Sequence, residues 1–277
     1  MTHATGAGYL KGGILPHMWC SGCGNGVVLS ALLRAFEELG YEKNETVVVT
    51  GIGCWGKADD YLLTNALHGT HGRALAFATG VKAYNPKLKV VVLMGDGDGV
   101  TIGGNHFIHA ARRNIDLTAI LVNNLNYGMT GGQVSGATPA DSRTSTTAFG
   151  NPERAFDICA LAGVSGANYV ARGTVYHGRK LQNSIKEALT RKGFSLVEAV
   201  SPCPTQYGRN NKMKDPLDML RWLKEKGISR DRFDRMEETA RDGYFAIGTL
   251  VDKDAPDFNT RYEEIRARAL SGGEGGR

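Results

Sequence analysis

The chain has 277 residues, of which 42% are hydrophobic, and a formal net charge of +5 from 33 Lys and Arg against 28 Asp and Glu. These values predict one large soluble domain with an appendage. The apolar runs are much shorter than the roughly 20 residues of a membrane span, and the N-terminus lacks the pattern of a signal peptide. The basic residues are interspersed with acidic ones. We therefore expect a cytoplasmic protein that binds neither membranes nor nucleic acid.

The first chemical signal along the chain is the pair Cys20 and Cys23, in a loop before a predicted helix at residues 27–39. Taken alone, a CxxC motif fits a redox dithiol, half of a zinc site or half of an iron–sulfur site. A zinc site is less favoured because the chain has no second CxxC and no His pair at zinc-finger spacing. A redox dithiol is less favoured because such a motif normally opens a helix directly after a strand, and no predicted strand precedes this one.

Two further cysteines follow predicted strands. Cys54 lies in the loop after a strand at 46–50, and Cys203 lies in the loop after a strand at 195–200. The carboxyl ends of parallel strands meet at one edge of a sheet, so both thiols are expected there. The fifth cysteine, Cys159, lies in an apolar helical pattern and is predicted to be buried. An odd number of cysteines without a secretion signal argues against a disulfide framework.

The most informative stretch is residues 90–133. Two apolar runs, Val90–Met94 and Ile120–Val122, each end in a polar loop, Gly95-Asp96-Gly97-Asp98-Gly99 and Asn123-Asn124-Leu125-Asn126-Tyr127-Gly128. The pattern predicts two buried parallel strands joined by a helix, with both loops at the ligand-binding edge of the sheet. Carboxylate, amide and carbonyl oxygens suit Mg²⁺. Adjacent glycines let the backbone approach a phosphate. The sequence therefore predicts a magnesium diphosphate site.

The remaining elements alternate between helix and strand. A pair of histidines, His68 and His71, stands among glycines and suggests anion binding, with His71 preferred. His106 and His109 fit a helix-surface pair better than metal ligands. The other predictions are helices at 58–66, 74–83, 156–163, 177–192, 216–226 and 230–240, a strand at 169–171, and a long Ser- and Thr-rich loop at 134–147 that is expected to be functional.

The polar loops also carry a family resemblance. The GDG at 95–97, the spacing of 28 residues from Asp96 to Asn124, and the following Tyr127-Gly128-Met129-Thr130-Gly131-Gly132-Gln133 resemble the thiamine diphosphate signature. Together with the four loop cysteines they resemble the β subunit of two-subunit 2-oxoacid:ferredoxin oxidoreductases, from about Tyr9 to Lys212. The resemblance implies an α/β fold of the thiamine diphosphate-binding type: a mostly parallel sheet with helices on both faces. We expect residues 1–207 to form this domain, and 208–277 to form a C-terminal helical arm that contacts another subunit, with a disordered tail at 271–277.

The resemblance also implies three cofactors and their ligands. A [4Fe-4S] cluster would be held by Cys20, Cys23, Cys54 and Cys203. Mg²⁺ would be bound by the side chains of Asp96 and Asn124 and by the carbonyl oxygen of Asn126. Thiamine diphosphate would contact Ile52, Gly53, Cys54, Trp55, His71, Gly97, Asp98, Gly128 and Met129.

The reaction implied by the resemblance is the coenzyme A-dependent oxidative decarboxylation of a 2-oxoacid, with ferredoxin as the electron acceptor, and its reverse. No motif supplies the Glu that activates thiamine diphosphate in related enzymes, so a partner α subunit is expected to provide it. The stretches 15–20 and 203–209 look most like 2-oxoglutarate-specific members, and Arg209 or Lys57 could bind a distal carboxylate. Gly131 stands where some relatives have a Lys that could bind the distal carboxylate, and glycine cannot do so. Pyruvate and branched-chain 2-oxoacids therefore stay open as alternative substrates. A non-redox thiamine carboligase and a zinc-binding scaffold are the alternatives.

Overall fold

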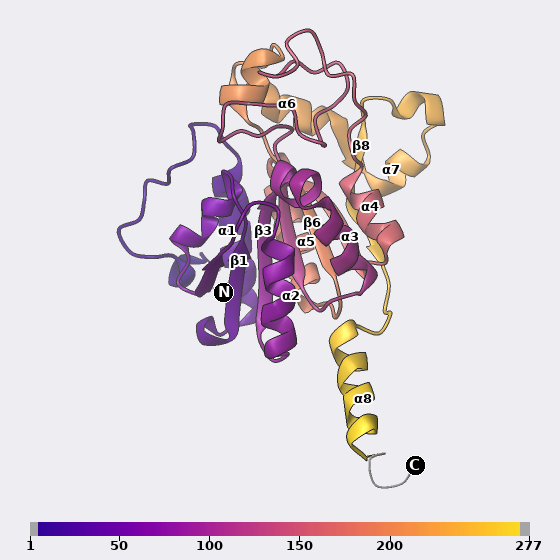
Figure 1. The fold of residues 1–277 in the computed structure, drawn as a ribbon. Coiled ribbons are helices and arrows are strands. Elements are labelled where there is room, and N and C mark those ends of the chain that lie inside the picture. The colour runs from indigo at the N-terminus through magenta and orange to yellow at the C-terminus, as the bar shows by residue number, and fades with distance from the viewer. Residues whose placement is uncertain (1–4, 272–277) are drawn as a thin grey trace.

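A single eight-stranded sheet forms the centre of the fold (Figure 1). The computed structural model describes residues 5–271. The strand order is β2-β1-β3-β4-β6-β5-β8-β7, and neighbours are parallel except for the antiparallel pair β5 and β8. The predicted α/β class with a mostly parallel sheet is therefore confirmed. The strands are β1 (Thr46–Thr50), β2 (Asn65–His68), β3 (Lys89–Gly95), β4 (Thr118–Asn123), β5 (Tyr169–Thr174), β6 (Ser195–Val200), β7 (Gly227–Ser229) and β8 (Phe245–Asp252).

Helices cover both faces of the sheet, because its central strands bury side chains on both sides. On one face, Val48, Val91 and Leu93 pack with α1 and α5; on the other, Val49 and Val92 pack with α2, α3 and α4. The helices are α1 (Asn25–Leu39), α2 (Ala74–Tyr84), α3 (Gly104–Arg112), α4 (Ile158–Ser165), α5 (Gly178–Thr190), α6 (Pro216–Lys226), α7 (Arg230–Asp234) and α8 (Phe258–Ser271). Within residues 5–271 no helix is long and apolar enough to cross a bilayer.

The prediction of a helix at residues 58–66 was wrong. A 3₁₀ helix at Trp55–Tyr61 leads into the edge strand β2, which pairs with β1 in the register Val47 to Asn65. Every residue of β2 is exposed. Such an edge strand has no buried face and so lacks the alternation of apolar and polar residues that marks a strand in a sequence.

The C-terminal segment contains strands as well as helices. Helix α6 has the predicted bounds, but a predicted helix at 230–240 is replaced by the short α7 and a 3₁₀ turn, and β7 and β8 extend the sheet beyond β5. Helix α8 then projects away from the body of the domain (Figure 1). Contacts of this segment with another subunit stay a prediction. The predicted disordered tail after Ser271 lies outside the described residues.

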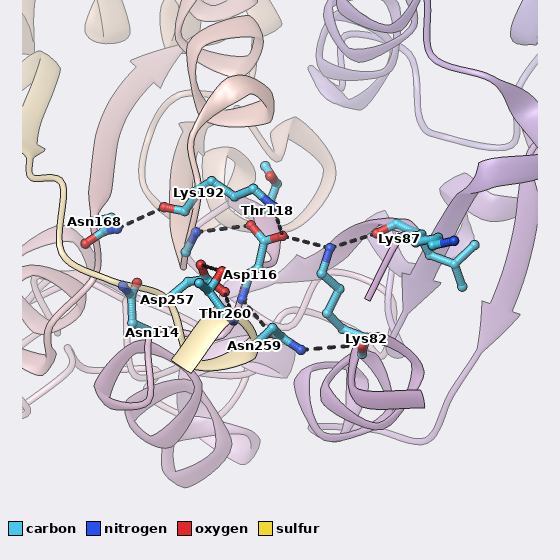
Figure 2. A network of polar contacts seen from close by, with 12 residues as sticks. Lys82, Lys87, Asn114, Asp116, Thr118, Asn168, Lys192, Asp257, Asn259 and Thr260 are labelled. Carbon is cyan, nitrogen blue, oxygen red and sulfur yellow. Dashed lines mark hydrogen bonds and ion pairs between the residues drawn. The ribbon is translucent and has the colours of Figure 1, made fainter. Parts of the chain in front are cut away.

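The chain between β8 and α8 is fixed at the amino ends of the strands by a polar network (Figure 2). The side-chain amides of Asn114 and Asn168 donate to the Ala255 carbonyl at 3.1 and 2.8 Å. Asp116, at the start of the same network, pairs with Lys82 Nζ at 2.7 Å and with Lys192 Nζ at 3.3 Å. This edge of the sheet is therefore held by partly buried polar contacts, whereas the opposite edge carries the polar loops.

Replacing Asp116 by alanine is expected to destabilise the fold by about 3–5 kcal/mol, because Lys82, whose side chain is 5% exposed, would keep its charge without its partner. Burial by itself raises the pKa of Asp116, but the hydrogen bond and charge of Lys82, with Lys192, lower it overall. The carboxylate therefore contributes stability above its unfolded pKa of about 3.9, and this contribution is lost as the pH falls through the lower folded value. Urea unfolding at several pH values measures both effects. The exposed pair Arg221–Asp218 is the control, and Asp218→Ala should change stability by less than about 1 kcal/mol.

Candidate functional site

The loops at the carboxyl ends of β1, β3 and β4 surround one cavity. The residues predicted to bind magnesium or thiamine diphosphate all line it, although they come from four separate stretches of the chain. They are Ile52, Gly53, Cys54, Trp55, His71, Asp96, Gly97, Asp98, Asn124, Asn126, Gly128 and Met129. Gly95, Val122, Tyr127 and Thr130, which carried no predicted ligand role, also line it.

Three of these residues converge in the way that a hexacoordinate cation requires. As oriented in the structure, the side-chain oxygen of Asn124 lies 3.1 Å from Asp96 Oδ1 and 2.6 Å from the carbonyl oxygen of Asn126. Adjacent oxygens around octahedral Mg²⁺ are about 2.9 Å apart, given metal–oxygen distances of 2.0–2.1 Å. With the amide reversed, its nitrogen would donate to both oxygens instead. The side-chain oxygen and nitrogen of Asn126 are buried and have no hydrogen-bond partner within residues 5–271. The residues present thus fit a Mg²⁺ ion.

Asp96 accepts a hydrogen bond from Ser135, a residue for which the sequence predicted no role. Asp96 is 1% exposed, and Ser135 Oγ donates to Asp96 Oδ2 at 2.5 Å. Burial raises the pKa of Asp96 to about 7, against the lowering effect of Ser135 and of nearby backbone N–H groups. A cation beside the carboxylate would favour its ionised form. Ser135 belongs to the Ser- and Thr-rich loop at 134–147, whose composition was the only signal for it.

Asp98 ties together the loops after β1, β2 and β3. Its Oδ1 accepts hydrogen bonds from His71 Nδ1 at 2.6 Å, from the Gly72 N–H at 2.7 Å and from the Ile52 N–H at 3.2 Å. A Cβ on Gly51 would lie 1.9 Å from Asp98 Oδ2, so only glycine fits above this carboxylate. His71 is fixed through Nδ1, which makes Nε2 the nitrogen that can meet a ligand in the cavity. Asp98 thus lines the cavity as predicted, while its carboxylate binds protein donors.

The four predicted cluster cysteines gather beside this cavity. The N–H of Cys23 donates to the Cys20 carbonyl at 3.0 Å, and Trp19 Nε1 donates to the Cys54 carbonyl at 2.6 Å, which joins the two cysteine loops. Burial, with a smaller contribution from the nearby thiols of Cys203, Cys54 and Cys20, raises the pKa of the Cys23 thiol to about 12. The four sulfur atoms are therefore close enough to repel one another as thiolates, which a cationic centre between them would relieve.

The cysteines do not form a site for a single ion. Among residues 5–271, no three His, Cys, Asp or Glu side chains are placed to share one metal ion. A zinc site would need such a group, whereas a cluster of four irons spreads its ligands over a larger volume.

Cys159 is buried, as predicted, and its Sγ donates to Glu198 at 3.1 Å.

Gly128 lies beside both the Cys203 thiol and the side chains of two candidate metal-binding residues. A Cβ at this position would lie 3.4 Å from Asn124 Nδ2, 3.4 Å from Asn126 Oδ1 and 3.5 Å from Cys203 Sγ. The Cys203 thiol and the side chains of Asn124 and Asn126 therefore all border the same point beside Gly128.

Two other candidates are accounted for by contacts within the protein. Trp55 is 2% exposed, donates from Nε1 to the Ile120 carbonyl at 3.1 Å and packs on Trp19 at 5.9 Å, so it supports the cavity from the core. Lys57 pairs with Asp60 at 2.7 Å on the surface. Arg209 is exposed in the segment after Cys203.

Comparison with known proteins decides the family. Residues 46–199 match the family described as thiamine pyrophosphate enzyme, C-terminal TPP binding domain. The chain is 48% identical to the 2-oxoglutarate synthase subunit KorB of Archaeoglobus fulgidus over 96% of both chains. It is 44% identical to the 2-oxoacid:ferredoxin oxidoreductase subunit beta of Saccharolobus solfataricus over 68% of this chain and 62% of that one. The chain belongs to the 2-oxoacid:ferredoxin oxidoreductase β subunits.

A third relative and a solved structure agree with this assignment. The β subunit described here is 47% identical to the 2-oxoglutarate synthase subunit KorB of Methanocaldococcus jannaschii, over 90% of this chain and 93% of the relative. Its fold matches the 2-oxoglutarate:ferredoxin oxidoreductase of Magnetococcus marinus with a TM-score of 0.85 and 32% identity, covering 100% of this chain and 94% of that chain. That structure was solved with 2-oxoglutarate, coenzyme A and succinyl-CoA bound.

Proposed function

We propose that this β subunit, joined to an α subunit, converts 2-oxoglutarate and coenzyme A to succinyl-CoA and CO₂, and passes the two released electrons to ferredoxin. The same site would carry out the reverse reductive carboxylation. The choice of 2-oxoglutarate is supported by relatives named 2-oxoglutarate synthase and by the substrate found in the structural relative. A cytoplasmic location is part of the same proposal.

The metal-bound end of the coenzyme would be held by the loops after β3 and β4. Asp96 and Asn124 would bind Mg²⁺ through side-chain oxygens, and Asn126 through its carbonyl oxygen. Gly97, Gly128 and Met129 would line the diphosphate, since they leave backbone groups accessible beside these ligands. Thiamine diphosphate, when bound, supplies the carbanion chemistry that makes decarboxylation possible.

The other end of the coenzyme would meet the Ile52–Trp55 loop and His71. Asp98 orients both, because its single carboxylate accepts hydrogen bonds from each. The Glu that activates the coenzyme would come from the α subunit, so the β chain alone should be inactive.

A [4Fe-4S] cluster would be held by Cys20, Cys23, Cys54 and Cys203. This proposal is supported by the surroundings of Gly128, where Cys203 Sγ lies close to the side chains of Asn124 and Asn126. A cluster and a coenzyme bound at these neighbouring sites would be close enough to exchange electrons directly. Cys20 is exposed, so electrons would leave toward ferredoxin on its side of the cluster.

Coexpression with the α subunit and anaerobic purification of the complex test the proposed reaction. The assay uses 2-oxoglutarate, pyruvate and branched-chain 2-oxoacids, each with coenzyme A and a viologen dye as the electron acceptor. We expect coenzyme A-dependent dye reduction that is fastest with 2-oxoglutarate. Faster reduction with pyruvate would overturn the substrate, and decarboxylation without dye reduction would show a non-redox carboligase.

Replacing Asp98 by asparagine is expected to weaken thiamine diphosphate binding by the complex about 10- to 100-fold. The reason is that hydrogen bonds to a charged group, here from His71, Gly72 and Ile52, contribute about 1.5–3 kcal/mol each, and the loops they hold form one side of the cavity. Isothermal titration of the complex with the coenzyme at saturating Mg²⁺ measures the affinity. Asp234→Asn removes the charge of an exposed aspartate paired with Arg230 and should leave it unchanged. Equal affinities in the two variants would contradict the role given to Asp98.

A further inference from the structure

A chain of buried polar contacts crosses the sheet and ends at the turn Asn124-Leu125-Asn126, which bears the proposed metal ligands. Glu198 on β6 is 2% exposed and lies outside the cavity lining. Its Oε1 accepts a hydrogen bond from Asn123 Nδ2 at 2.8 Å. Asn123 Oδ1 in turn accepts from the Leu125 N–H at 3.1 Å. The carboxylate is thus connected, through one side chain, to the middle residue of the turn.

That middle residue needs to be held. Leu125 has a φ of 67°, in the left-handed region that is unfavourable for a residue with a side chain. Its carbonyl accepts from Thr138 Oγ1 at 2.7 Å, and its side chain packs with Tyr207 and Met219. Together with the Asn123 contact, these interactions keep Leu125 in the conformation that aims its two neighbours at the metal position.

The identity of the residue at 198 explains how Asn123 is oriented. Glu198 Oε2 accepts from Arg172 Nε at 2.7 Å and from Cys159 Sγ at 3.1 Å. An ionised carboxylate accepts hydrogen bonds and cannot donate them. Asn123 must therefore turn its NH₂ group toward Glu198 and its oxygen toward the Leu125 N–H. A carboxylate is costly to bury in an apolar core, and here it sets the direction of an amide.

We propose that Glu198 is a positioning residue for the metal-binding turn, acting through Asn123. The inference rests on the proposed function, because it takes Mg²⁺ and thiamine diphosphate to bind at that turn. Arg172 belongs to the same unit: it supplies the opposite charge to Glu198 and donates from Nη2 to Asp157, the N-cap of α4, at 2.5 Å. Residues on β5 and β6 would thereby control a loop that follows β4.

An exchange of hydrogen-bonding partners tests the proposal. In Glu198→Gln the residue at 198 can both donate and accept, so it no longer fixes which way the Asn123 amide points. We expect the Kd for Mg²⁺ at saturating thiamine diphosphate to rise about 10- to 100-fold, as when contacts outside the ligand shell of other metal sites are removed. In Asn123→Asp two carboxylates face each other, and a similar loss is expected. In the double variant Asn123→Asp with Glu198→Gln, the new amide can donate to the new carboxylate, whose second oxygen still accepts from Leu125. Most of the affinity should return.

Titration calorimetry of the αβ complex measures the affinity, and amide hydrogen exchange at Leu125 in the absence of metal and coenzyme gives a second readout. Exchange should accelerate in Glu198→Gln and slow again in the double variant. Asn123→Ala serves if a charged variant fails to fold, because it leaves the Arg172–Glu198 pair intact and should also weaken Mg²⁺ binding. Cys159→Ala removes another Glu198 contact and should change neither readout.

The outcomes separate this inference from the proposed function. Unchanged Mg²⁺ affinity in Glu198→Gln, or an Asn123→Asp variant that binds as tightly as the double variant, would overturn the positioning role and leave the proposed function intact. A wild-type complex that binds neither Mg²⁺ nor thiamine diphosphate would overturn both. Recovery in the double variant, in affinity and in exchange, supports the inference.

Discussion

Replacement of Asp96 by alanine is expected to abolish the binding of Mg²⁺ and thiamine diphosphate while leaving the iron content of the complex unchanged. Asp96 supplies the only carboxylate among the three oxygen donors that converge on the metal position within residues 5–271, so its loss removes the charge that attracts the cation. The effect should exceed the roughly 10- to 100-fold loss that follows removal of a contact outside the ligand shell. Dye reduction with 2-oxoglutarate should disappear.

Coenzyme and iron analysis of the purified complex measures the result. Asp96→Asn is the matched variant: it keeps the shape and an oxygen but not the charge, and should retain weak binding. Asp141→Ala changes an exposed aspartate of the 134–147 loop and should bind the coenzyme normally. An Asp96→Ala complex that still bound thiamine diphosphate with wild-type affinity would place the metal elsewhere.

Replacement of Cys203 by serine is expected to give the opposite pattern. A serine oxygen is a poor substitute for a thiolate at iron, so the cluster should be lost or become labile, and the brown colour and dye reduction with it. Thiamine diphosphate should still bind, because Cys203 is not among the residues that line the proposed coenzyme cavity. The two variants therefore separate the two cofactors.

Iron, sulfide and thiamine diphosphate are measured in the anaerobically purified complex. Cys159→Ala is the control, since this buried cysteine contacts Glu198 rather than the cysteine loops, and its complex should keep both cofactors. A Cys203→Ser complex with undiminished iron would remove Cys203 from the ligand set. Loss of thiamine diphosphate together with iron would show that the two sites are not independent.

The strands and loops that form the cavity could be predicted from the sequence because each signal is local. Runs of buried β-branched residues ended by glycine and polar residues indicate parallel strands and their carboxyl-end loops. The topology then brings Asp96 and Asn124 together without further information. For the same reason Cys54 and Cys203 could be placed at one edge from the strands that precede them.

The contacts that orient the site could not be predicted in this way. Ser135, Asp98 and Glu198 act through partners that are 39, 27 and 75 residues away in the chain. No short pattern marks such a pair, because each residue alone fits an ordinary loop or strand. The strand β8 was missed for a related reason: only Ala246 and Ile247 are buried in it, so the strand has no regular alternation of buried and exposed residues.

Electron transfer within the complex tests the central claim, that both cofactors share one edge of this sheet, most directly. Electron paramagnetic resonance spectra are recorded before and after 2-oxoglutarate and coenzyme A are added anaerobically to the oxidised αβ complex. The account predicts a reduced iron–sulfur signal in the wild-type complex, and no such signal in the Asp96→Ala or Cys203→Ser complexes. A substrate-induced signal of wild-type intensity in the Cys203→Ser complex would contradict it.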